Sequence, residues 1–229
     1  MKRKQMPQFM NQDWYPTLLK NLMYEFLTWF VHFVKAAKPF VSVVNEGLEY
    51  SKVNKIINIE LNIGAGFETL KPFINQDIVV LDRTLERFDT NYDGLYTFIN
   101  CFHQFNSENA TNILTEISQK NHPVAVLEGN NNSLLQIFGM TIIVPLTILL
   151  TAPFVKPFRF SRLIFTYLVP VLPIVTFIDG SLALMKLYSP EDLDELVSKI
   201  KVSKYQWKSG KLDNGRGGKI IYLLGHPQQ

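Results

Sequence analysis

A pair of glycines that follows a short strand-like run could bring a ligand close to the main chain. Residues 55–61 are rich in β-branched side chains and are typical of a strand, and Gly64 and Gly66 follow before a short helical stretch. Because glycine has no side chain, backbone N–H groups in such a turn can approach a ligand at the positive end of the helix. The same glycines could serve a tight turn alone. A dinucleotide-binding loop would need a third glycine at the position of Thr69.

Two later strand ends carry polar side chains that could face the same ligand. Residues 78–81 form the second expected strand, which ends at Asp82, and residues 95–99 form the third, which leads into Asn100 and His103. His103 is the only histidine expected at the end of a sheet strand that faces the expected ligand site, so it is the candidate general base. Asp82 could instead cap a helix or end a solvated strand. Asn100 and His103 could be loop residues with locally satisfied hydrogen bonds.

In this order, these residues resemble the class I S-adenosylmethionine-dependent methyltransferases over most of the chain. That family has an acidic residue followed by glycines two, four and six positions later, and the matching positions here are Glu60, Asn62, Gly64 and Gly66. Asn62 therefore replaces the first glycine, which makes a positive φ less accessible to the backbone there. The resemblance implies that these four residues bind S-adenosylmethionine.

The resemblance also assigns roles to residues at the next strand ends. Asp82 would bind the ribose hydroxyls, and Asn100 and Phe102 would lie beside the methyl group of the cofactor within an aromatic–histidine motif. His103 would be the catalytic residue, and Gln104 stands where a second histidine would be expected. The N-terminal segment, and the apolar region before the last helix, resemble a poorly characterised, shortened bacterial branch of the family.

One departure from the family concerns the chain between the second and third strands. Only twelve residues separate Asp82 from Leu95, whereas a helix, a strand and a second helix normally fill that interval. A single βαβ unit alone needs about 30 residues. The missing strand is an edge strand in this fold, so the rest of the sheet can form without it. Its loss removes part of the expected adenine pocket and bears on activity more than on fold.

The elements that must position these residues alternate between helices and strands. Residues 16–50 should be helical and divided at Pro39, a helix should begin at Ser107 as its cap, and residues 123–128 should form the fourth strand. A capping sequence at Ser189 begins the last helix, before a terminal antiparallel hairpin. The sequence therefore predicts an α/β, Rossmann-like methyltransferase sheet, mostly parallel, with a C-terminal antiparallel hairpin. Its expected parts are an N-terminal helical extension at 1–50 and a methyltransferase-like domain at 51–229 that contains an apolar helical insert at 133–187.

The first helix carries apolar residues at steps of three and four, from Leu18 to Phe33. This spacing stacks them on one face and predicts an amphipathic helix that packs on a core. The alternatives are a helix that lies on a membrane or one that covers a ligand site.

The expected insert is the most apolar part of the chain. No charged residue occurs at positions 129–155, and a second uncharged run covers 163–178. A membrane-spanning helix needs about 20 apolar residues, but prolines interrupt both runs. We expect a helical hairpin that dips into one leaflet or lies at the interface; two full spans, or a helix pair buried in the protein or at a dimer interface, are the alternatives. Lys156, Arg159 and Arg162 would suit lipid headgroups, where each contributes about 1 kcal/mol, or would form a solvated loop.

Composition narrows the classes of function. A chain of 229 residues supports one sizeable core, and its 47% apolar against 19% charged residues indicate an excess of apolar surface. The net charge of +3 is too small and too scattered to indicate nucleic acid binding. Cys101 is the only cysteine, which excludes an internal disulfide, and the histidines lack metal-ligand spacing, so no metal site is expected. No signal peptide follows the basic start, so we expect a cytoplasmic protein attached peripherally to a membrane surface.

Three functions remain open at this point. The first is S-adenosylmethionine-dependent methyl transfer to a hydrophobic, lipid-like small molecule at a membrane surface. The second is a catalytically inactive methyltransferase-like module that binds or scaffolds at the membrane. The third is a different nucleotide-binding enzyme such as a short oxidoreductase, which is disfavoured by Thr69 and by the absence of the Tyr-x-x-x-Lys motif of that class.

Overall fold

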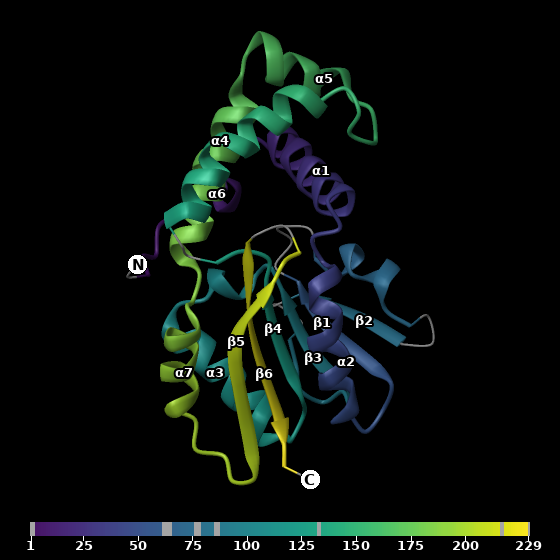
Figure 1. Cartoon of the computed structure of the whole chain (residues 1–229), viewed down its shortest axis with the longest axis vertical. Helices are drawn as coiled ribbons and strands as arrows, with labels where there is room; N and C mark the ends of the chain where they lie inside the picture. Colours follow the sequence, from purple (N-terminus) through teal and green to yellow (C-terminus); the bar gives the residue numbers. More distant parts are fainter. Residues whose placement is uncertain are drawn as a thin grey trace.

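The computed structural model describes residues 3–60, 66–75, 79–84, 88–131, 134–215 and 218–228, and within them only the backbone of residues 60, 79–84, 134–137, 140 and 141. These residues form a six-stranded sheet in the order β2-β1-β3-β4-β6-β5. Helices cover both faces of the sheet, and a lobe made of helices stands beyond one of its ends (Figure 1).

Four neighbouring strands of the sheet are parallel. β1 (Lys55–Glu60) pairs with β2 (Val79–Thr84) on one side and with β3 (Leu95–Ile99) on the other, and β3 pairs with β4 (Val124–Glu128). Every residue of β3 and β4 is buried, as expected of central parallel strands covered on both faces.

A C-terminal hairpin completes the sheet with the opposite strand direction. β6 (Lys219–Pro227) runs antiparallel to β4, and β5 (Tyr205–Asp213) pairs antiparallel with β6 at the edge. The prediction of an α/β fold with a mostly parallel sheet and a C-terminal antiparallel hairpin is therefore confirmed.

Side chains that alternate along the strands supply both faces of the core. Tyr96 and Phe98 of β3 belong to the apolar cluster that includes α3 (Ser107–Gln119) and α7 (Pro190–Ser198). Leu95 and Ile99 point the other way, into the cluster that includes α2 (Val41–Glu49). Because successive side chains of a strand face opposite sides, one apolar run serves two layers of helices.

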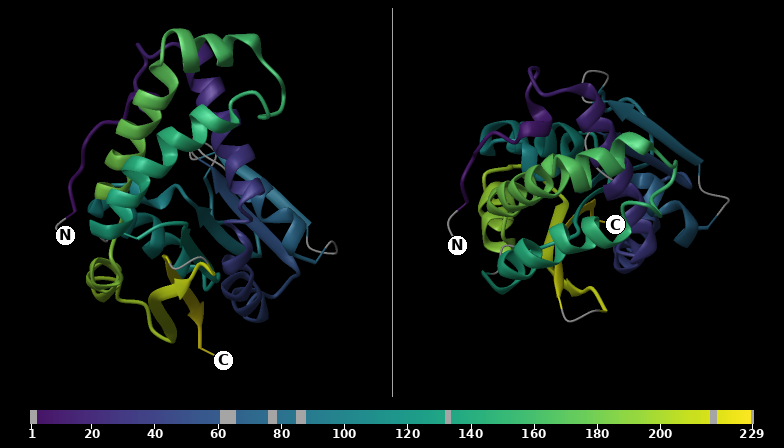
Figure 2. Two further views of the ribbon diagram at one scale, coloured as in Figure 1. Left: turned by 45° about the horizontal axis from the view of Figure 1, so that its top comes forward. Right: turned by 90° about the horizontal axis from the view of Figure 1, so that it is seen from above.

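The remaining helices form the lobe beyond the carboxyl ends of the parallel strands, which we call the helical lobe (Figure 1). α4 and α6 run side by side within it, and α1 packs against both (Figure 2). Phe26 of α1 contacts the cluster of Val144 and Ile148, and Leu22 lies in a second cluster with Leu172. The lobe consists of α1 (Thr17–Phe33), α4 (Leu134–Thr151), α5 (Phe160–Leu163), a π-helical turn (Ile164–Leu168) and α6 (Val171–Lys186).

Several element boundaries differ from those expected. Asn106, and not Ser107, caps α3, because its side chain accepts a hydrogen bond from Asn109 N at 2.8 Å. β2 continues to Thr84, two residues beyond the predicted end at Asp82. The helical stretch expected after Gly66 consists of two 3-10 turns, η3 (Phe67–Thr69) and η4 (Lys71–Phe73). Such short turns lack the aligned peptide dipoles of an α-helix, so the expected positive helix end is weaker here than predicted.

Other local predictions are confirmed. The N-terminal helical region is divided around Pro39, which lies in the 3-10 turn η2 (Lys38–Phe40) between α1 and α2. Ser189 and Asp192 form the expected capping box at the start of α7. Among the described residues, no single helix has both the length and the hydropathy of a membrane span; two bent pairs of helices pass the same test together, with bends of 68° and 81°.

Candidate functional site

The sheet has a topological switch point at β1. The chain passes from β1 to β2 on one side of it, and from β2 it crosses back to β3 on the other side. In open α/β sheets, ligands bind outside the carboxyl ends of the strands at such a point. Here that position lies between the ends of β1 and β3, on the side of the sheet that faces the helical lobe (Figure 1).

The residues predicted to bind the cofactor after β1 are only partly described. Glu60 is the last residue of β1, but its side chain, like Asn62 and Gly64 as a whole, lies outside the described residues. Gly66 precedes η3 with φ −78° and ψ −136°, so the backbone at this glycine is not left-handed. The roles assigned to these four residues stay predictions.

Asp82 lies within β2 and not at its end. In the parallel register it is paired with Asn58, whereas Thr84 is paired with Glu60, the last residue of β1. The expected position of Asp82 at the strand end is therefore wrong by two residues. Its side chain lies outside the described residues, and its predicted contact with the ribose is untested.

Asn100 joins the carboxyl ends of β3 and β4. It has φ 54°, in the left-handed region that asparagine tolerates better than most residues. Its backbone N–H donates to Leu127 O at 2.8 Å, and its Oδ1 accepts from Gly129 N at 2.7 Å. Asn100 thus fixes the relative position of the two strand ends from which the site is built.

Phe102 is a core residue in this structure. Its ring is buried and packs edge-on against Phe98 and Phe105, at centroid distances of 5.5 and 5.6 Å. A contact between Phe102 and a cofactor, as predicted from the family motif, would require this aromatic cluster to open.

His103 forms a buried pair with Glu128, a residue that the sequence analysis did not single out. His103 lies in the 3-10 turn η6 (Phe102–Gln104) after β3, and Glu128 is the last residue of the neighbouring strand β4. The imidazole Nδ1 is 3.1 Å from both carboxylate oxygens, and the backbone N–H of His103 donates to Glu128 Oε1 at 2.9 Å. The carboxylate therefore fixes the orientation of the ring and places the proton on Nδ1.

The other ring nitrogen of His103 is covered by the side chain of Gln104. Gln104 Oε1 accepts hydrogen bonds from Lys186 Nζ at 2.8 Å and from Asn11 Nδ2 at 2.9 Å, which fixes the orientation of the amide. Its Nε2 consequently donates to His103 Nε2 at 3.0 Å and to Gln8 Oε1 at 2.9 Å. With both ring nitrogens engaged, His103 can act as a base only after Gln104 has left Nε2.

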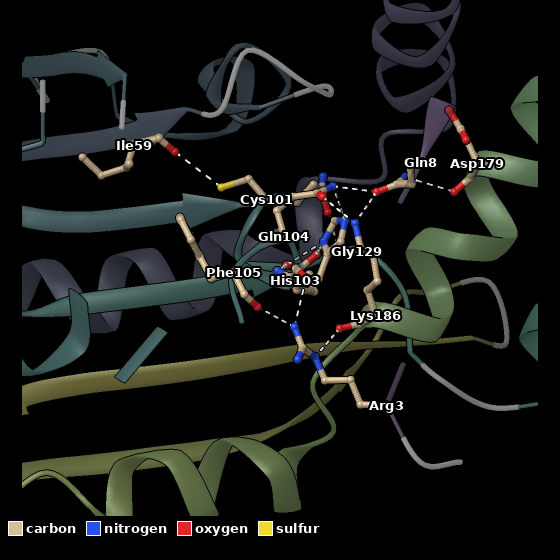
Figure 3. A network of polar contacts seen from close by, with 12 residues as sticks. Arg3, Gln8, Ile59, Cys101, His103, Gln104, Phe105, Gly129, Asp179 and Lys186 are labelled. Atoms are coloured by element: carbon tan, nitrogen blue, oxygen red, sulfur yellow. Dashed lines mark hydrogen bonds and ion pairs between the residues drawn. The ribbon is translucent and has the colours of Figure 1, made fainter. Parts of the chain in front are cut away.

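The N-terminal residues 3–12, here called the strap, close over His103 and Gln104. Arg3 Nε donates to Lys186 O at 2.7 Å, and its Nη2 donates to Phe105 O at 2.5 Å and to His103 O at 3.1 Å (Figure 3). The guanidinium also stacks on the ring of Tyr188, with its carbon 3.7 Å from the ring centroid. Burial lowers the pKa of Arg3, against the opposing charges of nearby acids.

α6 supplies two buried charged residues that hold the strap. Asp179 accepts from the backbone N–H groups of Phe9 and Met10 at 2.7 and 2.9 Å, and burial raises the pKa of its carboxyl group. Lys186 is 4% exposed, and its Nζ donates to Gln8 Oε1 at 3.1 Å as well as to Gln104. Burial lowers the pKa of Lys186, and the charge of Arg3 lowers it further.

An open pocket of about 450 Å³, here called the amide pocket, lies between the strap and Gln104. One wall atom has an unmet hydrogen bond: Asn11 Oδ1 is buried and has no partner among the described residues. The pocket is lined by Gln5, Met6, Pro7, Asn11, Gln12, Gln104 and Lys186.

The expected basic cluster of the insert is only partly presented to the surface. Arg162 is 1% exposed; its Nη2 donates to Glu25 Oε2 at 2.5 Å and its Nη1 to Val155 O at 2.8 Å. Arg159 is exposed but pairs with the same carboxylate through Nε at 2.7 Å. The prediction that all three basic side chains face headgroups is therefore wrong for Arg162, because α1 provides a carboxylate that draws it into the lobe. Lys156 is exposed.

The comparisons with known proteins include a distant structural likeness. No protein family model matches the chain, and no curated protein matches it. A solved structure described as a putative Zn-dependent alcohol dehydrogenase from Rhodobacter sphaeroides superposes with a TM-score of 0.46 and 12% identity, over 97% of this chain and 99% of that one. A likeness of this size gives no argument about function. Within the described ranges, no three His, Cys, Asp or Glu side chains are grouped so that they could hold a metal ion.

Proposed function

We propose that the chain binds S-adenosylmethionine at the carboxyl ends of β1 and β3 and transfers its methyl group to a hydrophobic small molecule at a membrane surface. The observation that carries the proposal is the switch point between these strands. The acid-and-glycine segment from Glu60 to Gly66 leaves one strand there, and Asn100 follows the other. These are the segments that the resemblance to class I methyltransferases connects with the cofactor.

The strand order supports the same family of folds. In the fold that the sequence resembles, the last two strands include one inserted antiparallel, and the third strand is an edge strand. Here β6 is inserted antiparallel between β4 and β5, and β2 stands at the edge where a third strand would continue the sheet. The observed strand order is therefore that of the expected sheet without its third strand. The short interval from Asp82 to Leu95 cannot supply that strand.

The chemistry of such a transfer asks little of the protein. The sulfonium group of the cofactor already activates the methyl group, so the protein accelerates the displacement chiefly by holding donor and acceptor in line. A base is needed only if the acceptor must lose a proton. His103, with Glu128 behind it, is the candidate for that task when Gln104 moves off its Nε2.

The surface of the helical lobe supports attachment to a membrane. Large apolar side chains are exposed along α4 and around the turn that follows it, with Leu150 at 65% and Phe160 at 70%. Of the charged residues between 134 and 186, only the basic Lys156 and Arg159 are exposed, while Arg162, Asp179 and Lys186 are buried. An apolar surface whose only exposed charges are positive suits the interface of an anionic bilayer. The exposed apolar set of the lobe includes Phe138, Ile142, Ile143, Leu146, Leu149, Leu150, Phe154, Phe158, Phe160, Tyr167 and Leu168.

Two observations favour a second candidate, a catalytically inactive module with the same fold. Residues 88–94, which lead into β3, contain no helix or strand, so an adenine-binding wall of the usual kind is missing from that described segment. His103 is also sealed by Gln104. This candidate would attach to a membrane through the lobe and bind the cofactor weakly or not at all.

Calorimetric titration of the purified chain with S-adenosylmethionine, S-adenosylhomocysteine and NAD separates these functions. The proposal expects micromolar binding of the two sulfur compounds, weakened about tenfold or more by Asp82→Asn, which removes a charged hydrogen-bond partner. Asp13→Asn, an exposed acid on the N-terminal segment, is the matched control and should bind normally. A folded sample that binds neither sulfur compound at millimolar concentration would favour the inactive module, and selective binding of NAD would contradict both.

A further inference from the structure

We infer that the amide pocket receives the carboxylate of an amphiphilic acid, and that this carboxylate is the methyl acceptor of the proposed reaction. The methyl transfer to this acid rests on the proposed function, whereas the binding of the acid in the pocket does not. The acceptor class is thus a carboxylic acid with an apolar tail, and the product is its methyl ester.

The walls of the amide pocket are suited to an anion. Lys186 contributes an ammonium group. Gln5, Asn11 and Gln12 each contribute an amide NH2 group that makes one hydrogen bond within the protein and has a second hydrogen to donate. None of the described residues that line it is acidic. An ammonium together with amide N–H groups is a set of donors that a carboxylate accepts well.

Asp179, whose charge raises the pKa of Lys186, is already hydrogen-bonded to other groups. Its carboxylate accepts from two backbone N–H groups of the strap. The hydrogen bonds of Lys186 Nζ go to two neutral amide oxygens, those of Gln8 and Gln104. A buried ammonium whose hydrogen bonds go only to neutral groups is stabilised further when an anion approaches it.

The state of His103 points to an acceptor that needs no base. A carboxylic acid, with an ordinary pKa of about 4, is already ionised at neutral pH, whereas an alcohol must lose a proton as it attacks. In the observed structure Gln104 covers the nitrogen that would take this proton. The closed arrangement of His103 and Gln104 therefore suits a carboxylate and excludes an alcohol until Gln104 moves.

The transfer balances without any proton movement. A lone pair of one carboxylate oxygen forms the new bond to the methyl carbon, while the bond from that carbon to sulfur breaks and its electron pair goes to sulfur. S-adenosylmethionine becomes S-adenosylhomocysteine, and the carboxylate becomes a neutral methyl ester. Lys186 can hold the second carboxylate oxygen throughout and so positions the first.

The apolar part of such a substrate has surfaces to contact beside the pocket. Met6 and Pro7 line the pocket itself. Both side chains are exposed, so an apolar tail can contact them. The carboxylate end and the tail of an amphiphile would thus meet the polar and the apolar residues of the strap.

The test begins with binding, in the absence of cofactor. Hexanoate, 1-hexanol and hexylamine have the same tail and differ in the charge of the head group, so calorimetry with the three isolates the effect of that charge. We expect hexanoate to bind at least about tenfold more tightly than hexanol, and hexylamine to bind most weakly. Lys186→Met should abolish the preference for hexanoate. Lys4→Met, which removes an exposed lysine of the same strap, should retain it.

A second variant protects the test against misfolding of Lys186→Met. Asn11→Asp adds a negative charge to the pocket wall and should weaken hexanoate about tenfold while leaving hexanol unchanged. Equal affinity for hexanoate and hexanol in the wild type, or an unaltered preference in a folded Lys186→Met or Asn11→Asp protein, would overturn the pocket assignment.

Methyl transfer is then measured with S-adenosylmethionine labelled in its methyl group. The expected product from hexanoate is an extractable ester that releases labelled methanol in alkali, and none is expected from hexanol. Labelling of hexanol but not hexanoate would overturn the acceptor assignment. If hexanoate binds through Lys186 but the cofactor does not bind, the proposed function fails while the anion pocket stands.

Discussion

Glu25 of α1 and Arg162 of the insert form a buried ion pair that joins the two parts of the helical lobe, with Glu25 Oε2 2.5 Å from Arg162 Nη2. Arg162 is enclosed almost completely, whereas the side chain of Glu25 is 14% exposed. The pair is 137 positions apart in the sequence. It therefore fixes how the insert packs against the N-terminal helix.

Glu25→Gln should destabilise the protein by about 3 kcal/mol, because it leaves the buried guanidinium of Arg162 without its counter-charge. Urea denaturation measures this loss. Glu46→Gln, which breaks the exposed pair with Lys208, is the control and should cost less than about 1 kcal/mol. Equal losses of stability in the two variants would show that the hydrogen bonds of Arg162 to Val155 O and Pro157 O are enough to stabilise its buried charge.

Arg3→Ala should open the strap and expose His103. The variant removes three hydrogen bonds to backbone oxygens and the contact with Tyr188. With each hydrogen bond worth about 1 kcal/mol, we expect modification of His103 by diethyl pyrocarbonate to become about tenfold faster or more.

Mass spectrometry that resolves each histidine provides the internal controls for this measurement. The exposed His32 should react at the same rate in all proteins, and the buried His122 and His226 should stay protected if the variant is folded. Lys4→Ala should behave as wild type. Fast modification of His103 in the wild type would contradict the closed strap.

The stability contributed by Lys186 should increase with pH in the alkaline range. Burial lowers its pKa below the ordinary value of 10.5, with Arg3 acting in the same direction and Asp179 against it. Between the lowered pKa and 10.5, the unfolded state binds more protons than the folded state, so stability rises with pH.

The comparison of wild type with Lys186→Met isolates this effect, because tyrosines whose pKa is also shifted are present in both proteins. Urea denaturation from pH 7 to pH 10 should show the wild type gaining stability relative to the variant. If the difference in unfolding free energy between the two proteins stays constant, or shifts in favour of Lys186→Met as pH rises, burial does not disfavour the ammonium form.

Leu150→Asp should reduce sedimentation of the protein with anionic vesicles about tenfold or more. A leucine that enters an apolar phase contributes about 1.5–3 kcal/mol, and an aspartate would also be repelled by the lipid charge. Val53→Asp is the control, since Val53 is exposed before β1, at the end of the sheet opposite the lobe. Wild-type protein that stays in the supernatant with such vesicles would refute membrane attachment.

Elements with a strong local pattern could be predicted from the sequence, and the closed site could not. The strands around Ile57, Phe98 and Val126 and the capping box at Ser189 depend on neighbours within a few positions. The pairing of His103 with Glu128 depends on the register of β3 against β4, which the sequence does not display. Asparagine at 106 competes with Ser107 for the cap of α3, and only the backbone geometry decides between them.

The sequence did not predict the position of the strap, because the residues of the strap have no periodicity of their own. Gln8, Phe9 and Met10 are placed by Asp179 and Lys186, about 170 positions later. A signal for this contact did exist. Two charged residues seven positions apart lie on one face of an otherwise apolar helix. Such charges are rarely buried without partners, and the polar N-terminal segment offered those partners.

The short connection that leads into β3 has a consequence for how copies of this chain behave in concentrated solution. In the part of the chain that the structure describes, β2 is bonded to β1 alone, so its outer N–H and C=O groups form an open template for another strand. The opposite edge, β5, carries Lys208 and Lys211, whose charges discourage such pairing, whereas the first half of β2, residues 79–81, is apolar and precedes the charged Asp82 and Arg83. Aggregation by edge-to-edge strand addition should therefore start at this first half of β2, and a proline placed there would improve solubility without touching the strand ends that build the site.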